Sequence, residues 1–188
     1  MKTSIVGGEF KNRSLLSPKT NEVRPLSSRV RKSLMDILGN KVENCLLLDL
    51  FAGIGSVSIE FLSRGAKSVI SVEKSPKIAS FLTKNLSNFN LLDRCTILNY
   101  SVERFMLNCH DIKFDIIYMD PPFSYDLDAL LYSFSDFKCY HENSIFILHH
   151  FFKKKPKEQV GCWKISDSRT YSSNTITFYT PEKLSVDD

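Results

Sequence analysis

Residues 46–64, LLLDLFAGIGSVSIEFLSR, decide the fold that the sequence predicts. The apolar run at 46–50 is typical of a strand that is buried on both faces. Gly53 and Gly55 then form a turn, and the stretch 56–64 has the composition of a helix that ends at the next glycine. A buried strand that turns directly into a helix begins a strand–helix–strand crossover. The segment therefore predicts an α/β fold with a parallel sheet.

The rest of the chain repeats this alternation of short apolar runs and helix-like stretches. We expect strands at 46–50, 68–72, 95–98, 114–119 and 144–148, helices at 28–38, 56–64, 75–88 and 127–134, and final strands at 163–167 and 175–179. No helix separates the last two runs, so they should form an antiparallel pair at one edge of the sheet. A small hairpin is expected around residues 4–10. The inner face of the first helix should consist of Val30, Leu34, Ile37 and Leu38.

The charge of the chain is unevenly distributed. Residues 1–41 hold nine Lys or Arg and three acids, whereas the rest of the chain holds 16 basic and 18 acidic residues. Lys and Arg that neutralise phosphates gain affinity through counterion release, so the basic N-terminal arm suggests a nucleic-acid partner. The alternative is a solvated basic arm without a partner. The run KKKPK at 153–157 is expected to be a soluble loop.

Length and composition predict one compact domain. The chain has 188 residues, 43% of them hydrophobic, and the arm at 1–41 should belong to the same unit as a catalytic domain over 42–188. No stretch approaches the roughly 18 apolar residues of a membrane span, and the start lacks the apolar segment of a signal peptide. The five cysteines are scattered without a CxxC pair, which indicates reduced thiols and no metal site. We therefore expect a cytoplasmic monomer that binds neither membrane nor metal.

The glycine turn is the candidate cofactor site, because a sheet of this kind leaves a crevice where its first strand meets its first helix. Glu73 stands 18 residues beyond Gly55, at the end of the next strand, and could accept both hydroxyls of a ribose. Ser58 replaces the third glycine of the GxGxxG pattern, which argues against a dinucleotide and for S-adenosylmethionine. The candidate cofactor-binding residues are Asp49, Phe51, Gly53, Gly55, Glu73, Lys74, Ser101 and Val102. The alternative is a mere tight turn with a charge at a strand end.

The second candidate site is Asp120-Pro121-Pro122-Phe123, directly after the strand at 114–119. Two prolines forbid both sheet pairing and an immediate helix, so the chain must form a loop there. Asp120 and the carbonyl of Pro121 could accept the two N–H groups of an exocyclic amine and aim its lone pair at the sulfonium methyl. Phe123 offers a face on which a flipped base stacks, at about 1–3 kcal/mol. The alternative is that the prolines only end a strand and that Phe123 fills the core.

Other side chains could contribute to the same pocket. Tyr125 is a weaker candidate for contact with the base. His149 and His150 follow the strand at 144–148, but they are expected to be packing residues and are not placed in the catalytic set.

These residues resemble a known family. The stretches LLLDLFAGIGSVSIEFLSRGAKSVISVEKSP and DIIYMDPPF, with IVGGEFKNRSLLSP and the later RPLSSRVR near the start, are similar to the RsmD family of 16S rRNA guanine-N2 methyltransferases. Tyr171 and the stretch NTITFY match that family's C-terminal hairpin. The likeness covers nearly the whole chain. Three positions depart from the family pattern, namely Leu26, Ser101 and His149, where the family usually has threonine, aspartate and glutamate.

The resemblance implies a Rossmann-like class I methyltransferase sheet of seven strands, mostly parallel with an antiparallel C-terminal edge, preceded by a small N-terminal arm. It further implies that S-adenosylmethionine is the cofactor and that a guanine of small-subunit rRNA, in an assembling 30S particle, is the substrate. The glycine loop and Glu73 would hold the cofactor, and Asp120 to Phe123 would hold the target base. The residues expected to face RNA are Arg13, Arg24, Arg29, Arg31 and Tyr125.

Two alternatives remain open from the sequence. Adenine-N6 methyltransferases that act on DNA use the same Asp-Pro-Pro-aromatic loop, although such enzymes commonly carry a target-recognition domain for which 188 residues leave little room. A non-catalytic RNA-binding assembly factor with this fold is the second alternative, and Ser101 motivates it.

Overall fold

The computed structural model describes residues 3–19 and 26–182. The chain divides into two compact units, Met1–Val102 and Glu103–Asp188, which we call unit 1 and unit 2 and describe separately. The prediction of one domain with an N-terminal arm at 1–41 stays a prediction. No helix among the described residues is both long and apolar enough to cross a membrane.

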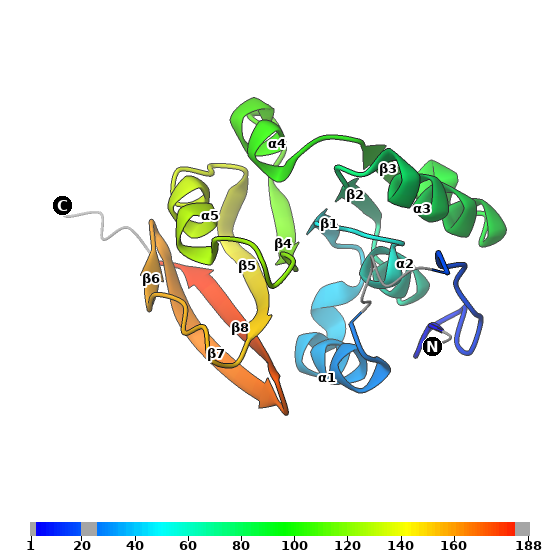
Figure 1. The fold of residues 1–188 in the computed structure, drawn as a ribbon, viewed down its shortest axis with the longest axis horizontal. Helices are drawn as coiled ribbons and strands as arrows, with labels where there is room; N and C mark the ends of the chain where they lie inside the picture. Colours follow the sequence, from blue (N-terminus) through cyan, green and yellow to red (C-terminus); the bar gives the residue numbers. More distant parts are fainter. Residues whose placement is uncertain (1–2, 20–25, 183–188) are drawn as a thin grey trace. The chain divides into compact units, whose positions relative to one another are not determined.

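Unit 1 contains a parallel sheet with the strand order β3-β2-β1 (Figure 1). Its strands are β1 (Leu46–Leu50), β2 (Ser68–Val72) and β3 (Cys95–Leu98). Its helices are α1 (Ser28–Leu38), α2 (Ser56–Ser63) and α3 (Pro76–Asn88), with short 3-10 turns η1 (Gly39–Val42) and η2 (Leu92–Arg94). Helix α2 connects β1 to β2 and α3 connects β2 to β3, as the alternating sequence pattern predicts.

Local sequence signals fix the boundaries of these elements. The hydroxyl of Ser75 accepts a hydrogen bond from the Ile78 amide (3.4 Å) and Pro76 occupies the first turn of α3, so this helix begins where the sequence predicts. The range of α1 is also confirmed, and Val30, Leu34 and Leu38 are buried as expected.

The prediction that Ile37 faces inward is wrong, because its side chain is 39% exposed. Arg31 and Met35 are buried instead, so the inner face of α1 is rotated toward these two positions. The apolar pattern of the sequence could not indicate the true inner face, because one of its buried residues is an arginine.

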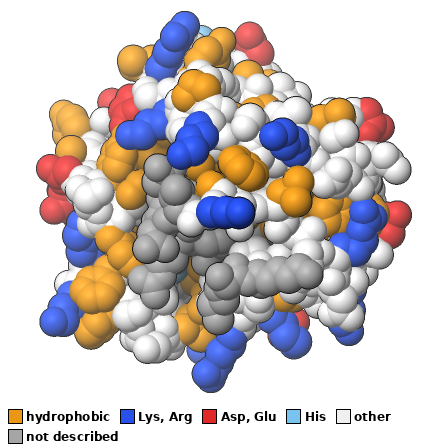
Figure 2. Space-filling model, turned by 45° about the vertical axis from the view of Figure 1, so that its right-hand side comes forward, with side chains coloured by type: hydrophobic (Ala, Val, Ile, Leu, Met, Phe, Trp, Pro, Cys, Tyr) orange, Lys and Arg blue, Asp and Glu red, His pale blue; other side chains and the backbone are white. Residues whose placement is uncertain are grey.

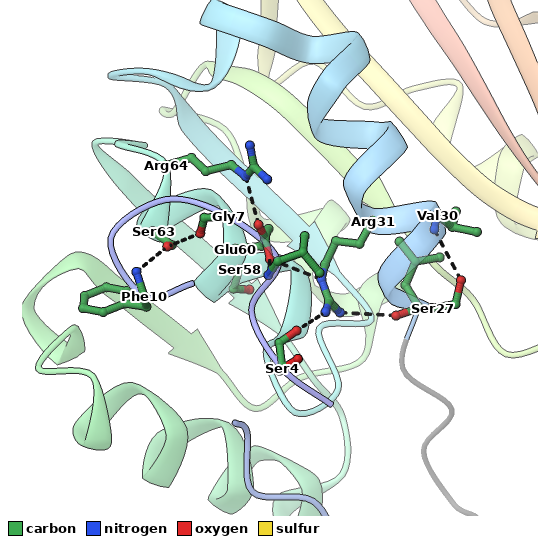
Figure 3. A network of polar contacts seen from close by, with 12 residues as sticks. Ser4, Gly7, Phe10, Ser27, Val30, Arg31, Ser58, Glu60, Ser63 and Arg64 are labelled. Atoms are coloured by element: carbon green, nitrogen blue, oxygen red, sulfur yellow. Dashed lines mark hydrogen bonds and ion pairs between the residues drawn. The ribbon is translucent and has the colours of Figure 1, made fainter. Parts of the chain in front are cut away.

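Arg31 joins the N-terminal segment to α2 (Figure 3). Its guanidinium is fully buried, and its Nε lies 3.3 Å from Oε2 of Glu60, which is also fully buried. Its two Nη groups donate to the carbonyls of Leu26 (3.2 Å) and Ser4. The prediction that Arg31 faces RNA is therefore wrong, because the side chain is enclosed by polar partners inside unit 1 and cannot reach a ligand from solvent.

Glu60 has further partners that hold the N-terminal segment against α2. Its Oε1 accepts from Nε of Arg64 (2.9 Å), and its Oε2 accepts from the amide of Val6 (2.8 Å). Ser63 adds two hydrogen bonds, to the carbonyl of Gly7 (2.6 Å) and from the amide of Phe10 (2.9 Å), both shown in Figure 3. The predicted hairpin is present as a short antiparallel pairing that extends to residue 15, beyond the expected 4–10. The amide of Ile5 donates to the carbonyl of Arg13 (3.0 Å), and the amide of Leu15 donates to the carbonyl of Thr3 (2.8 Å).

Unit 2 carries the strand order β4-β5-β8-β7-β6. It consists of α4 (Val102–Asn108), β4 (Phe114–Met119), α5 (Leu127–Phe134), β5 (Tyr140–Phe151), β6 (Gln159–Val160), β7 (Trp163–Tyr171) and β8 (Asn174–Pro181). Strands β4 and β5 are parallel, whereas β5–β8, β8–β7 and β7–β6 are antiparallel, as Figure 1 shows in yellow to red. The predicted fold class is confirmed, although the described strands number eight rather than seven because of the two-residue strand β6.

Strand β5 is longer than the predicted 144–148. Its final residues pair with β8 as far as Phe151, which lies opposite Asn174. The histidines in this stretch suggested a strand end, but pairing with β8 extends the strand through them. His149 and His150 therefore lie within the sheet and are both buried.

We predict that substitution of Arg31 by Met lowers the free energy of unfolding by about 3 kcal/mol, because it breaks a buried ion pair and leaves the Glu60 carboxylate short of a partner. The matched control is Arg29→Met, since Arg29 lies on the same helix with an exposed side chain and its loss should change stability by less than about 0.5 kcal/mol. Urea unfolding of the full chain measures both. Equal stability of the two variants would contradict the structural role of Arg31.

We predict a pH dependence of stability that originates at His150. Burial lowers the pKa of His150 from its ordinary value of 6.5, so below that value the unfolded chain binds a proton that the folded chain does not. The free energy of unfolding should therefore fall as the pH falls from 6.5 toward the lowered folded-state pKa. Urea unfolding at about pH 7.5 and about pH 5.5 measures the loss, and His150→Gln should reduce it. An unchanged pH dependence in the variant would rule out this origin.

Candidate active site

The turn between β1 and α2 has an unusual backbone. Phe51, Gly53 and Gly55 have φ values of 67°, 57° and 84°, all in the left-handed region that favours glycine. A Cβ atom at Gly55 would also lie 2.2 Å from Cδ1 of Leu82. The glycine at this position is thus required by both backbone conformation and close packing, as expected for a turn that lets a ligand approach the backbone.

Asp49 supports this turn from inside unit 1. Its side chain is buried, and its Oδ2 accepts from the amide of Ser58 (3.1 Å) and from the Ser58 hydroxyl. The same hydroxyl lies 2.8 Å from Oγ of Ser71 on β2. Asp49 therefore fixes the first turn of α2, and its predicted direct contact with the cofactor stays a prediction.

Glu73 closes the turn from the neighbouring strand. It follows β2 directly, and its Oε2 accepts from the amide of Gly53 (3.0 Å) while its Oε1 accepts from the amide of Ser75 (2.8 Å). Each carboxylate oxygen has a second lone pair, so the pair of oxygens can still accept hydroxyl groups. The structure brings Glu73 and the glycine turn together, which the ribose-binding role requires.

The far side of this site is formed by the chain after β3. The side-chain amide of Asn99 donates to the carbonyl of Glu73 (2.7 Å). The sequence did not predict this contact, and only the position of Asn99 at a strand end could have suggested it. Ser101 is half-buried and Val102 is buried at the start of α4, whereas Lys74 is exposed. The glycine turn, the carboxylate and this polar rim fit a nucleoside cofactor without phosphates.

In unit 2, Asp120 is held by a histidine. The Asp120 Oδ1 lies 2.6 Å from Nδ1 of His149, whose side chain is buried, whereas the carboxylate is 24% exposed. Oδ2 of Asp120 has the hydroxyl of Tyr118 at 3.4 Å, which is a long hydrogen bond. The carboxylate is therefore fixed through one oxygen, and the other can accept from a substrate.

His149 contacts Asp120, whereas the sequence predicted only a packing role for it. Met119 pairs with Leu148 in the parallel register of β4 and β5, so Asp120 and His149 each follow a paired residue. This register could have suggested the contact, but it becomes visible only when the strand neighbours are known.

Phe123 stands out from the loop that begins at Asp120. Its side chain is 43% exposed, which contradicts the alternative that it fills the core. Its ring centroid lies 5.7 Å from that of Phe151 and 6.4 Å from that of His149. Pro121 is buried and Pro122 is exposed, so the first proline anchors the loop and the ring is left free on one face to stack on a base.

Tyr125 closes the same loop. Its amide donates to the carbonyl of Pro122 (2.8 Å), and its hydroxyl donates to Oε1 of Glu103 (2.6 Å). Burial, followed by the Glu103 carboxylate, raises the pKa of Tyr125 to about 12, so its hydroxyl is protonated at neutral pH. Its predicted contact with the base or RNA is not tested by this arrangement.

The remaining basic residues predicted to face RNA differ in their surroundings. Arg13 is exposed, but it donates to the carbonyl of Asn88 (2.6 Å) and lies over the ring of Phe89, 4.2 Å from its centroid. Arg29 is exposed and Arg24 lies outside the described residues. Figure 2 shows Lys and Arg side chains spread over this face among hydrophobic and other side chains. RNA contacts of Arg13 and Arg29 stay predictions.

The fold is similar to that of solved methyltransferase structures. A structure from Escherichia coli titled as the putative methyltransferase yhhF has a TM-score of 0.84 and 23% identity, with coverage of 97% of this chain and 99% of that chain. An RNA methyltransferase from Salinibacter ruber, in complex with S-adenosyl-L-homocysteine, has a TM-score of 0.63 and 15% identity, with coverage of 88% and 98%. This is the fold of class I methyltransferases.

The family is shown by the sequence. The family model described as Conserved hypothetical protein 95 matches residues 3–180, so the chain belongs to that family. The putative rRNA methyltransferase YlbH of Bacillus subtilis is 27% identical over 178 residues, which are 93% of this chain and 97% of the relative. The ribosomal RNA small subunit methyltransferase D of Haemophilus influenzae is 32% identical over 125 residues, which are 65% of each chain.

These findings confirm the resemblance to the RsmD family and, with it, the enzyme class, a methyltransferase.

We predict that His149→Ala lowers kcat for methyl transfer by about tenfold to a hundredfold, because Asp120 loses the partner that fixes its carboxylate. His149→Asn should recover part of this loss, since an Asn amide can replace the Nδ1 donor, and KM for S-adenosylmethionine should stay unchanged for both. Steady-state kinetics measure these effects. The control is His141→Ala, because His141 forms a similar pair with Asp115 (2.9 Å). These two residues lie near the starts of β5 and β4, whereas Asp120 follows the end of β4. Equal kinetics of the His149 and His141 variants would exclude a positioning role.

Proposed function

We propose that this protein transfers a methyl group from S-adenosylmethionine to the exocyclic N2 of a guanine in small-subunit rRNA. The observation that carries the proposal is the Asp120 carboxylate, fixed through Oδ1 by His149 and followed by an exposed aromatic ring at Phe123. The RsmD family to which the chain belongs supports rRNA as the substrate, because curated relatives bear the name ribosomal RNA small subunit methyltransferase.

The residues of unit 2 account for recognition of the amine. The lone pair of an exocyclic amino group is delocalised into the base, so the amine is a poor nucleophile. Oδ2 of Asp120 and the carbonyl of Pro121 would accept its two N–H groups and turn the nitrogen toward a tetrahedral geometry. Phe123 would hold the base in place by stacking, which contributes about 1–3 kcal/mol.

The proton that the amine loses has an acceptor at the same place. Oδ2 of Asp120 would accept the N–H hydrogen bond of the amine, and the 24% exposure of the side chain would allow the proton to pass to water. His149 fixes the carboxylate through Oδ1, and the amine is assigned to Oδ2, which has only the long contact with the Tyr118 hydroxyl. Contacts that are stronger in the transition state than with the bound base raise the rate of methyl transfer, whereas binding of the base alone does not.

The residues of unit 1 would hold the cofactor. Glu73 would accept the ribose hydroxyls, and the backbone of the turn at Gly53 and Gly55 would meet the amino-acid end. When bound, S-adenosylmethionine supplies a methyl group on a positively charged sulfonium. Ser101 and Val102 would line the adenine, and Ser101 is the position at which cofactor affinity is expected to differ from that of relatives with aspartate.

The biological setting forms part of the same proposal. We propose that the substrate rRNA belongs to an assembling 30S particle and that the protein acts as a monomer in the cytoplasm. The basic N-terminal arm supports an RNA partner, since residues 1–41 hold eight Lys and Arg besides the buried Arg31, against three acids.

We predict that Asp120→Asn lowers methyl transfer at least about a hundredfold, because the neutral amide lacks the negative charge that stabilises the positive charge developing on the amine, and leaves binding of S-adenosylmethionine largely intact. The matched control is Asp128→Asn, which removes an exposed carboxylate from the first turn of α5. Methyl transfer from labelled S-adenosylmethionine to small-subunit particles, deproteinised small-subunit rRNA and plasmid DNA measures activity, and calorimetry measures cofactor binding.

The outcomes separate the alternatives. Label in DNA alone would replace rRNA by DNA as the substrate. Failure of the wild type to bind S-adenosylmethionine at about millimolar concentration, a range in which even weak ligands bind, would favour the non-catalytic assembly factor. Unchanged turnover of Asp120→Asn would refute the role of the carboxylate.

A further inference from the structure

The loop after β5, residues 152–157 with the sequence FKKKPK, lies against the loop that carries Phe123. Nζ of Lys154 donates to the carbonyl of Phe123 (3.2 Å) and to the carbonyl of Tyr125 (2.9 Å). We call residues 152–157 the lysine loop. The expectation that it is only a soluble loop does not account for these contacts, which attach it to the proposed base-binding residues.

An aromatic path leads from the base-binding loop into the lysine loop. The ring of Phe123 lies 5.7 Å from that of Phe151, which lies 4.9 Å from that of Phe152. Phe123 and Phe152 are both 43% exposed, whereas the ring between them is half-buried. Two exposed rings thus contact the same half-buried ring, and neighbouring exposed apolar side chains rimmed by polar residues are typical of a binding surface.

Basic side chains accompany the second exposed ring. Nζ of Lys153 lies 5.8 Å from the ring centroid of Phe152. Lys155 and Lys157 are also exposed, and Glu158 is the single acid in the stretch 152–158. Lys154 is turned toward carbonyls of the neighbouring loop, so the other three lysines supply the positive charge that faces solvent.

The lysine loop is held in shape by hydrogen bonds. The amide of Lys154 donates to the carbonyl of Phe151 (2.9 Å), and the amide of Phe152 donates to the carbonyl of Ser173 (3.1 Å). At its other end, the hydroxyl of Tyr179 donates to the carbonyl of Lys157 (3.1 Å). A loop that is ordered before binding loses less conformational entropy when a ligand binds.

We propose that the lysine loop binds the single-stranded RNA that flanks the target nucleotide, with an adjacent base on Phe152 and backbone phosphates at Lys153 and Lys155. The proposal rests on the proposed function, since it extends the RNA site beyond the methylated base. Aromatic rings interleaved with lysines are the combination by which proteins bind single strands, because every base has a face to stack and every linkage carries a negative charge. A duplex would offer phosphates but no free base for Phe152.

The test compares three variants of the full chain in binding a fluorescein-labelled oligouridylate of about 12 nucleotides, a length in the range of one single-strand site. For Lys153→Gln/Lys155→Gln we expect roughly tenfold weaker binding at low salt and a slope of log K against log salt that is smaller by about 1.4, since two phosphate contacts are lost. For Phe152→Ala we expect roughly tenfold weaker binding with an unchanged salt slope. Fluorescence anisotropy at several salt concentrations measures affinity and slope.

The matched control is Lys113→Gln/Lys138→Gln, which removes the same charge at the opposite ends of β4 and β5. Both lysines are exposed, and Lys113 precedes β4 whereas the loop at Asp120 follows it. The control should bind the oligonucleotide like the wild type. Equal losses in the control and in Lys153→Gln/Lys155→Gln, no binding by the wild type, or equal dependence on Phe152 for a duplex of the same length would overturn the proposal.

Methylation of small-subunit rRNA by the wild type separates this proposal from the proposed function. If the wild type methylates the RNA but the lysine-loop variants bind the oligonucleotide like the wild type, the lysine-loop proposal alone is refuted. If the variants lose oligonucleotide binding and the wild type methylates no RNA, the proposed function fails while the lysine loop stands as an RNA-binding surface.

Discussion

The turn that follows β1 constrains the rest of unit 1, because its backbone must pass through the left-handed region three times within five residues. Glycine makes this conformation accessible at Gly53 and Gly55, but a turn of this kind stays fixed only when its amides have partners. Glu73 provides one such partner across the sheet, and Asp49 holds the first turn of the helix that follows through Ser58. Two carboxylates of neighbouring strands thus shape the surface on which a nucleoside cofactor would lie.

The same principle operates at the end of β4. Asp120 begins a loop in which two prolines prevent sheet pairing. His149 on the adjacent strand β5 forms a hydrogen bond with Oδ1 of Asp120. The consequence for the proposed catalysis is orientation, because a hydrogen bond at one oxygen limits the rotation of the carboxylate. The lysine loop contacts the loop that follows β4, because Nζ of Lys154 donates to the carbonyl of Phe123. This hydrogen bond helps to fix the loop that carries Phe123.

A buried ion pair attaches the N-terminal segment to α2. Arg31 and Glu60 are fully enclosed, and the pair is surrounded by the carbonyls and amides that a segment without regular strands leaves unpaired. Such a pair contributes little net stability compared with well-packed apolar residues, but removal of one partner is costly. Its role is therefore to specify how the N-terminal segment packs on α2. The basic character of that segment results partly from this internal requirement and not only from an RNA partner.

The sequence by itself determined the strands β1 to β4, the helices α2 and α3, the glycine turn with Glu73, and the loop at Asp120. These features depend on local chemistry, namely periodic burial, the conformational freedom of glycine and the missing amide of proline, and local chemistry can be read along the chain. Only the tertiary structure decided that Arg31 faces inward while Arg29 faces solvent, and that His149 contacts Asp120. An arginine or a histidine is stable in either environment, and the choice depends on a partner from a distant part of the sequence, here Glu60 or the carboxylate on the neighbouring strand.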